Sequence, residues 1–318
     1  MLLNNLIFSF NVVMPVFLVL FVGYFLRGKI LDSKTVGRLN WIVFNCALPL
    51  MLFRDIAGAD FTSVLDLGLI LFVVVSTLVI FTVTCLFAPV IVNQEEEGAF
   101  IHGVFRGNYA IVGLPIIANI LGNSQTGKSA MIITFLVPLY NILAVLILTI
   151  KSRNKDTNKG NAGFKTFLRN IIKNPLIIGV ILGLPFSVWS IRLPLFLDGA
   201  VNTLANLASP LALLSIGASI NLSQIRNRLK PAVIAAALKL IVTPLICVSI
   251  ALLLGFTGER IVILYVTFAV PTAVNSYIMA DMMGNDSVLA ANIILLTILG
   301  SLFTITIGVF WLRMLGVF

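Results

Sequence analysis

The sequence predicts an all-α membrane protein with ten transmembrane helices, arranged as two inverted repeats of five helices each. Apolar residues make up 59% of the chain and charged residues 10%, and the mean hydropathy is +1.10, so too little polar surface is present to cover a soluble globule. The apolar residues also fall into runs of spanning length. Finally, short motifs of the first half recur in the second half at nearly one offset.

The apolar runs are about 20 residues long, which is enough to cross about 30 Å of hydrocarbon. The N-terminus lacks the basic residues of a cleavable signal, so the first run is expected to remain as the first helix. The ten expected helices lie near residues 6–27, 37–57, 67–92, 99–121, 129–150, 174–191, 199–221, 230–254, 259–281 and 287–312.

The polar stretch 151–173 is the linker-like segment of the chain, and it divides a first five-helix repeat (1–150) from a second (174–318). Lys and Arg in short loops favour the cytoplasmic side of a membrane. Counted in alternate loops, fourteen of them lie on the side that holds the linker and five on the other side. We therefore expect a multi-pass protein of the cell membrane (inner or plasma membrane), with a cytoplasmic central loop and both termini extracytoplasmic.

An odd number of spans in each half makes the two halves enter the membrane from opposite sides, so similarity between them implies an inverted repeat. Three motifs recur in the same order at offsets of 160 to 162. They pair Pro15 and Gly23 with Pro175 and Gly183, Ala47-Leu48-Pro49-Leu50 with Ala208-Ser209-Pro210-Leu211, and Leu121-Gly122-Asn123 with Met283-Gly284-Asn285.

The fourth apolar run contains residues that an unbroken transmembrane helix would not be expected to contain. They are Arg106, Gly107, Gly113 and Pro115. Glycine weakens a helix and proline removes a backbone donor, so polar backbone groups are freed at membrane depth. Such breaks are tolerated inside protein or along a watery cavity, and transporters bind substrates there. The repeat offset places a partner break in the ninth run, at Pro271. The sequence therefore predicts a carrier with its binding site at the two breaks.

Small polar side chains near both breaks can hydrogen-bond a carboxylate beside the positive ends of half-helices. The alternative is that they only join neighbouring helices. The candidate substrate-binding positions are Arg106, Gly107, Asn108, Pro115, Pro271, Thr272, Asn275 and Ser276, with Asn45 as a further candidate.

Ionisable residues inside apolar runs are functional candidates by default. Arg106 attracts an anion, snorkels to an interface, or pairs with the loop 95–97 or with Asp281. Lys239 forms a buried pair or supports the fold near the break. Asp281 is an interfacial cap or takes part in ion coupling. His102 relays protons or lies at an interface.

Other function classes lack their sequence signals. An intramembrane enzyme needs paired carboxylates, His-Glu-x-x-His or Gly-x-Ser-x-Gly, and none occurs, so no enzyme activity is expected. The net charge of +9 comes from short loops rather than a basic face, so no nucleic acid partner is expected. No metal site or cofactor is expected beyond a coupling Na⁺ or H⁺. The alternative function is a sodium- or proton-coupled symporter or antiporter of another solute, for which Asp281 is the acidic residue near the break.

The motifs, taken in order, resemble the auxin efflux carrier family, and in particular bacterial members of the malate or malonate permease type. The resemblance covers essentially the whole chain. It is carried by Asn45-Cys46-Ala47-Leu48-Pro49, Arg106-Gly107-Asn108, Gly113-Leu114-Pro115, Asn174-Pro175-Leu176, Ala208-Ser209-Pro210-Leu211, Lys239-Leu240 with Pro244, and Val270-Pro271-Thr272-Ala273-Val274-Asn275.

The resemblance implies a fold similar to bile-acid symporters and sodium-proton antiporters, with helices four and nine crossing near Asn108 and Pro271. It implies that small organic anions such as malate, malonate or auxin-like acids bind at this crossing. Helices one, two, six and seven would form a scaffold and a homodimer, and the others would move in an elevator-type alternating access. The plant carriers hold a carboxylate in the third helix, but the run 67–92 has none after Asp66, so their mechanism and auxin itself are not expected to transfer.

Overall fold

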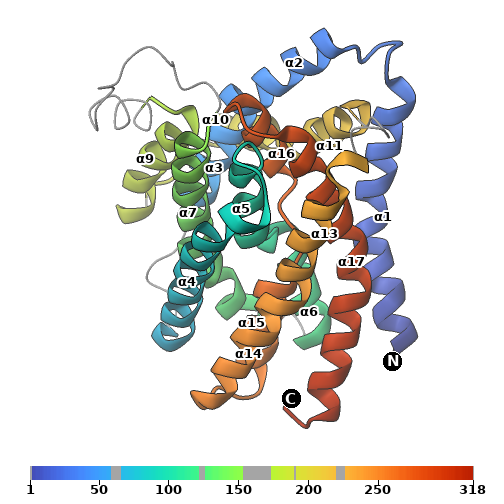
Figure 1. Cartoon of the computed structure of the whole chain (residues 1–318). Coiled ribbons are helices and arrows are strands. Elements are labelled where there is room, and N and C mark those ends of the chain that lie inside the picture. Colours follow the sequence, from blue (N-terminus) through green and yellow to red (C-terminus); the bar gives the residue numbers. More distant parts are fainter. Residues whose placement is uncertain are drawn as a thin grey trace.

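The structure is a computed structural model, and it describes residues 2–58, 66–121, 126–152, 173–189, 191–219 and 226–317. Over these ranges the chain is helical and has no β-strand, which confirms the predicted all-α fold class (Figure 1). The α-helices are α1 (Leu2–Leu26), α2 (Ser33–Ile42), α3 (Leu48–Ala57), α4 (Leu67–Ile91), α5 (Glu97–Phe105), α6 (Leu114–Leu121), α7 (Thr126–Ile150), α9 (Pro175–Val188), α10 (Leu195–Asn206), α11 (Ala208–Ser219), α13 (Leu229–Ala237), α14 (Thr243–Leu253), α15 (Glu259–Ala269), α16 (Asn275–Met282) and α17 (Ser287–Met314).

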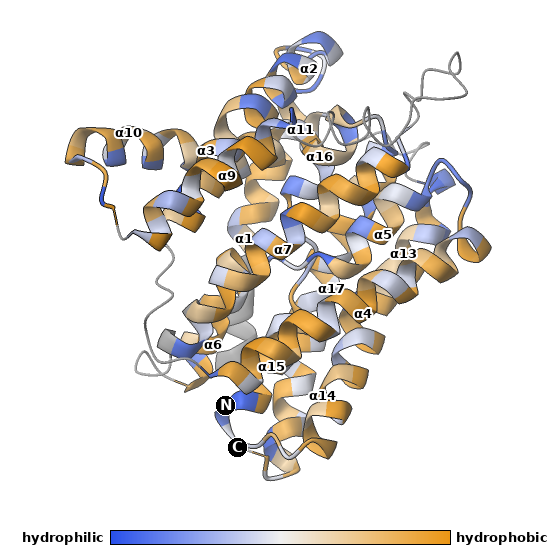
Figure 2. Cartoon of the chain, turned by 90° about the vertical axis from the view of Figure 1, so that its left-hand side faces the viewer, coloured by the Kyte–Doolittle hydropathy of each residue, from blue (hydrophilic) through white to orange (hydrophobic). Residues whose placement is uncertain are grey.

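Six helical segments of the described chain are long and apolar enough to cross a membrane. They are Ser33–Ala57, Leu67–Ile91, Met131–Ile150, Leu195–Ser219, Leu229–Leu253 and Ser287–Met314, and the shorter apolar helices are Met14–Leu26, Tyr109–Leu121 and Pro175–Val188. Apolar residues also cover outward faces, as on α4 and α14 (Figure 2). The chain is therefore a multi-pass membrane protein. The count of ten spans and the division at residues 151–173 stay predictions, and residues 153–172 of that linker lie outside the described residues.

Three of the described helices are widened by a π-helical turn, and each turn ends two residues before a proline. The turns are Val43–Ala47, Tyr109–Gly113 and Leu238–Val242, and the prolines are Pro49, Pro115 and Pro244. Proline has no N–H for the carbonyl four residues back, and its ring crowds that carbonyl. The helix therefore takes a bond that spans five residues, such as the one from the Leu114 N–H to the Tyr109 carbonyl. Wide turns of this kind are frequent at functional sites.

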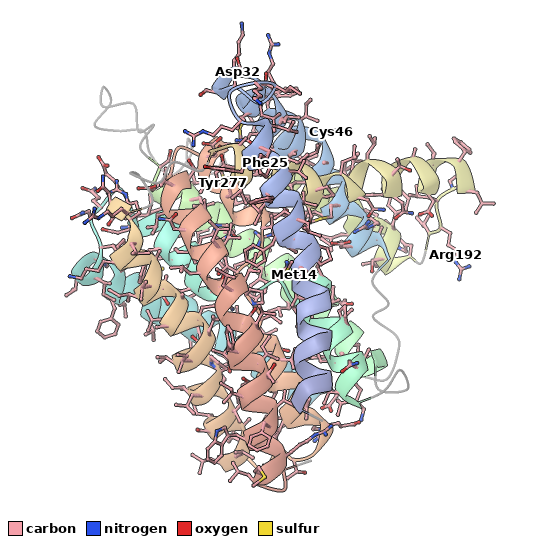
Figure 3. The ribbon with its side chains drawn as sticks, turned by 90° about the vertical axis from the view of Figure 1, so that its right-hand side faces the viewer. Met14, Phe25, Asp32, Cys46, Arg192 and Tyr277 are labelled. Carbon is pink, nitrogen blue, oxygen red and sulfur yellow. The ribbon has the colours of Figure 1, made fainter. Side chains whose placement is uncertain are left out.

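Glycines bring two pairs of helices into backbone contact. A Cβ on Gly217 of α11 would overlap the carbonyl oxygen of Leu20 in α1, and a Cβ on Gly183 of α9 would lie 2.9 Å from the carbonyl oxygen of Phe53 in α3. Close backbone approach of this kind is typical of small residues between membrane helices. The helices α1, α2, α3, α9 and α11 thus pack as one group, from which α10 projects near Arg192 (Figure 3).

The remaining helices pack around α5, α15 and α16, which are the most enclosed elements. Every residue of α5 is buried, and so is every residue of α15 from Ile261 to Ala269. The first six residues of α16, from Asn275 to Ala280, are buried as well. The two helices that the sequence predicts to be broken therefore lie at the core of this group, where lipid cannot reach their freed backbone groups.

Candidate functional site

Two interrupted helices meet at their breaks. The helices α5 and α15 both end there, and the chain continues into α6 and α16. Between the two breaks, Gly107 and Thr272 form an antiparallel backbone bridge. The N–H of Asn108 donates to the carbonyl oxygen of Pro271 at 2.8 Å. The breaks in the fourth and ninth apolar runs are therefore in direct contact, and this contact is called the crossing below.

Local sequence explains why both helices stop at the crossing. Val270 precedes a proline, which holds it out of the α conformation, and it is extended at φ −62° and ψ 148°. Arg106 ends α5 with an extended backbone at φ −82° and ψ 118°. Gly107 permits the close approach, because a Cβ there would lie 2.9 Å from Cγ2 of Val270. Main-chain bonds across the crossing replace helical bonds that neither break can form.

Thr272 ties the second break to two neighbouring helices. Its side chain is fully buried, and Oγ1 donates to the carbonyl oxygen of Gly103 in α5 at 2.7 Å. Its N–H donates to Oγ1 of Thr297 in α17 at 3.1 Å. The hydroxyl of this predicted substrate ligand is thus bonded within the protein.

Two basic side chains are buried beside the crossing. Arg106 is 5% exposed and Lys239 is 1% exposed. Nζ of Lys239 lies 3.3 Å from the position that a Cβ on Gly107 would take. Nη1 of Arg106 donates to Sδ of Met279 at 3.0 Å and lies 3.4 Å from Nε2 of His102. Within the described ranges, neither cation forms an ion pair with a carboxylate.

Three of the four acidic residues that the sequence offers as partners for Arg106 are bonded elsewhere. Glu96 forms an ion pair with Arg228, just before α13, at 3.0 Å. Glu97 forms an ion pair with Lys151, just after α7. Asp281 accepts a hydrogen bond from Nδ2 of Asn40 at 2.7 Å. The interactions found for Arg106 in the described chain therefore leave its charge uncompensated.

Unsatisfied polar atoms gather on the first turn of α16. Asn275 is 5% exposed and Ser276 is 1% exposed, yet Oδ1 of the first and Oγ of the second have no hydrogen-bond partner among the described residues. Nδ2 of Asn275 faces Sδ of Met51 at 3.9 Å. Asn108 is half-buried, and its side chain forms no hydrogen bond with the described residues. These groups are available to a ligand at the crossing.

Of the other predicted site residues, Asn45, Pro115 and Asp281 lie away from the crossing, whereas His102 lies beside it. Nδ2 of Asn45 donates to the carbonyl oxygen of Trp41 on its own helix at 2.9 Å. Pro115 is the second residue of α6, beyond the π-helical turn. Asp281, near the end of α16, lines a cavity of about 460 Å³ that is bounded by the loop between α1 and α2 and by α2, α11, α16 and α17. His102 is fully buried against Arg106.

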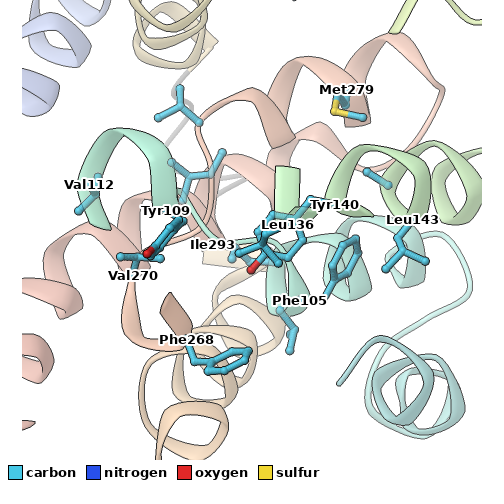
Figure 4. Packing of buried hydrophobic residues seen from close by; sticks show 14 of the residues in the cluster. Phe105, Tyr109, Val112, Leu136, Tyr140, Leu143, Phe268, Val270, Met279 and Ile293 are labelled. Atoms are coloured by element: carbon cyan, nitrogen blue, oxygen red, sulfur yellow. The ribbon is translucent and has the colours of Figure 1, made fainter. Parts of the chain in front are cut away.

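Three residues of the crossing are not found by sequence reasoning, namely Tyr140, Met279 and Thr297. Tyr140 is 3% exposed, its Oη lies 3.5 Å from the Cβ position of Gly107, and it packs in the apolar cluster with Phe105 (Figure 4). A tyrosine, a methionine and a threonine in apolar runs are ordinary core residues. Only the fold brings them to the break.

Interrupted helices that bury polar backbone inside an apolar bundle are the construction of membrane transporters. The chain belongs to the membrane transport protein family, whose profile matches residues 8–309, and this confirms the resemblance to auxin efflux carriers. It is a transporter and not an enzyme, as the sequence predicts.

Three relatives of the chain are transporters by name. The chain is 24% identical over 277 residues to an uncharacterized transporter of Methanothermobacter thermautotrophicus, which covers 86% of this chain and 88% of that protein. It is 22% identical over 315 residues to an uncharacterized transporter of Methanocaldococcus jannaschii, with 93% and 96% covered. It is 25% identical over 305 residues to a putative malonate transporter of Rhizobium meliloti, with 93% of each chain covered.

Proposed function

We propose that the chain is a secondary transporter of small organic anions, and that the anion binds at the crossing. The observation that carries this proposal is the pair of buried basic side chains, Arg106 and Lys239, for which the described residues supply no carboxylate. The relative named as a putative malonate transporter fits this chemistry, because malonate is a small dicarboxylate.

The energetics favour an anion over a neutral or cationic solute. Placing an arginine or lysine at membrane depth costs about 2.5–3.5 kcal/mol on insertion scales. A buried ion that is left without a partner costs several kcal/mol more than one that is paired. A carboxylate bound beside Arg106 and Lys239 offsets this cost, whereas a cation adds to it. The bound anion therefore supplies the negative charge that the described residues do not place beside Arg106 and Lys239.

The half-helices add donors for the same anion. The π-helical turn before α6 begins at Tyr109, and α16 begins at Asn275, so both start within three residues of the Gly107–Thr272 bridge. The start of a helix carries the positive end of its dipole, and this attraction remains at α16 although the N–H groups of Ser276 and Tyr277 bond the carbonyl oxygens of Ala273 and Val274. Carboxylates bind at such helix starts.

Two matched contacts support the ten-helix inverted repeat. Gly23 of α1 meets the carbonyl oxygen of Leu214 in α11, and Gly183 of α9 meets the carbonyl oxygen of Phe53 in α3. Gly183 follows Gly23 by 160 positions, and Leu214 follows Phe53 by 161, which are offsets that the sequence motifs share. The packing of α1 on α11 thus repeats the packing of α9 on α3 with the two halves exchanged.

The mechanism we propose is an elevator-type alternating access. A scaffold of α1, α2, α3, α9, α10 and α11 stays fixed, and the other helices carry the crossing past it. Exposed apolar residues on α10, such as Leu195 at 92% exposure, offer a surface for lipid or for a second copy in a homodimer. The protein lies in the cell membrane, with the central linker in the cytoplasm and both termini on the extracytoplasmic side.

The alternative is sodium- or proton-coupled transport of another solute, which would draw on Asp281. The experiment that separates the two is uptake by purified protein in liposomes, with acetate, malonate and malate as probes and with imposed sodium, proton or no gradients. We expect saturable uptake of at least one carboxylate, and we expect the other carboxylates to inhibit this uptake competitively. Uptake of an amine or a neutral solute, with no uptake of any carboxylate, would reject the proposal.

A further inference from the structure

Arg106 is held in place by two neutral side chains that come from the two different breaks. His102 lies one turn earlier on α5, and its Nε2 is 3.4 Å from Nη1 of the arginine. Met279 lies on α16, and its Sδ accepts a hydrogen bond from the same Nη1 at 3.0 Å. One nitrogen of the guanidinium thus joins the first half of one interrupted helix to the second half of the other.

Both neighbours fix the guanidinium without cancelling its charge. The sulfur of Met279 is a weak acceptor that carries no charge. A guanidinium can only donate, so the form of His102 that fits this contact is the neutral imidazole whose Nε2 accepts and whose Nδ1 carries the proton. A carboxylate at either position would form a charge-assisted bond with the guanidinium and neutralise it.

We propose that His102 and Met279 are positioning residues that hold Arg106 while leaving its full charge to the transported anion. This proposal rests on the proposed function and extends it, because it states which side chains must stay neutral for an anion to bind. Met279 follows Asn275 by four residues, so both side chains stand on one face of α16. The guanidinium is therefore one helical turn from the unsatisfied polar atoms at the start of that helix.

If His102 and Met279 served folding alone, a negatively charged side chain would be favoured at these two positions rather than a neutral one. An arginine buried at 5% exposure is stabilised most by a carboxylate that pairs with it. If His102 and Met279 served only stability, a glutamate at either position would improve the protein and leave transport unchanged. If they serve the anion, the same glutamate would stabilise the fold and compete with the substrate.

The test compares glutamate with glutamine at each position, because the two side chains share a shape and differ in charge. Full-length Met279→Glu, Met279→Gln, His102→Glu and His102→Gln are reconstituted in liposomes, and malonate uptake is measured over a range of malonate concentrations. Each glutamate variant is expected to raise the KM about tenfold or more relative to its glutamine partner, since it neutralises Arg106. Each glutamine variant is expected to stay within about threefold of the wild-type KM, because a neutral acceptor is kept.

Thermal unfolding in detergent without malonate provides the second readout. Each glutamate variant is expected to unfold at a temperature equal to or above that of its glutamine partner, and a lower temperature would overturn the proposal. Equal KM values for glutamate and glutamine variants, beside normal wild-type uptake, would reject the positioning role alone. If the wild type takes up none of acetate, malonate and malate, the proposed function fails, and the positioning role fails with it.

Discussion

The N–H of Asn108 donates to the carbonyl oxygen of Pro271 at 2.8 Å, so the two interrupted helices are joined by main chain at their breaks. A proline cannot donate in return, and the neighbouring bridge between Gly107 and Thr272 completes the contact. The side chain of Asn108 takes no part in this bond. It stays half-buried, without a hydrogen bond to the described residues, and it is available to a substrate.

Replacing Asn108 with alanine is therefore expected to abolish transport without loosening the crossing. The backbone N–H that bonds Pro271 is present in alanine as well. Uptake of malonate, malate and acetate in liposomes measures the first effect, and expression with thermal unfolding measures the second. Near-normal uptake of all three anions by Asn108→Ala would remove this side chain from the site.

Thr297 is expected to matter for stability, because it accepts the hydrogen bond of the Thr272 N–H at 3.1 Å. Thr297→Val keeps the shape of the side chain and leaves that buried N–H without a partner, which costs about 1–3 kcal/mol. Thr82→Val is the matched control, because the Thr82 hydroxyl is exposed and bonds only the carbonyl of Leu78 in its own helix. In detergent, the unfolding temperature should fall by several degrees relative to the wild type for Thr297→Val and not for Thr82→Val. Equal unfolding temperatures for the two variants would contradict this role of Thr297.

The sequence is sufficient to predict the breaks, because proline and glycine act on the helix that contains them. Gly107 and Pro271 lie where their runs are interrupted, and Pro115 follows a widened turn, although Pro89 and Pro138 are accommodated inside continuous helices. The repeat offset then leads from the first break to the second without any structure. The predicted all-α fold has the same basis, since helices occupy the apolar runs that composition and length define.

The environment of the cations could not be predicted in the same way. The contact between Arg106 and Met279 joins residues that are 173 positions apart, and nothing in either local sequence indicates it. The sequence therefore leaves Arg106 open between an anion, an interface and an acidic partner. The structure narrows these alternatives by showing that Glu96, Glu97 and Asp281 are bonded to other residues.

Close packing of α1 on α11 is expected to depend on Gly217, because a Cβ there would overlap the carbonyl oxygen of Leu20. Backbone atoms cannot move aside as a flexible side chain can, so Gly217→Ala should destabilise the protein by about 1–3 kcal/mol. Gly199→Ala in α10 is the control, since no atom lies within 4 Å of its Cβ position. Thermal unfolding distinguishes the two, and a stable, active Gly217→Ala would contradict the tight contact between these helices.

The hydrogen bond from Asn40 in α2 to Asp281 in α16 is expected to hold this conformation, because it joins the proposed scaffold to the proposed moving part. Asn40→Ala removes a bond to a charged group worth about 1.5–3 kcal/mol, so the population of other conformations should rise about tenfold or more. Asn202→Ala is the matched control, because its amide bonds Asp198 within α10. Fluorescence energy transfer between labels on α2 and α16 measures this change in population. Identical distributions of transfer efficiency for both variants would argue against a role of the Asn40–Asp281 hydrogen bond in holding the conformation.

The central claim is that an organic anion binds at the crossing because Arg106 is buried there without a carboxylate partner. The most direct measurement is liposome uptake of radiolabelled acetate, malonate and malate by the wild type and by Arg106→Gln, with thermal unfolding as the check on folding. We predict saturable uptake of at least one of these anions by the wild type, and a fall in affinity of about tenfold or more in the folded variant. Equal affinity and rate in Arg106→Gln would contradict the account.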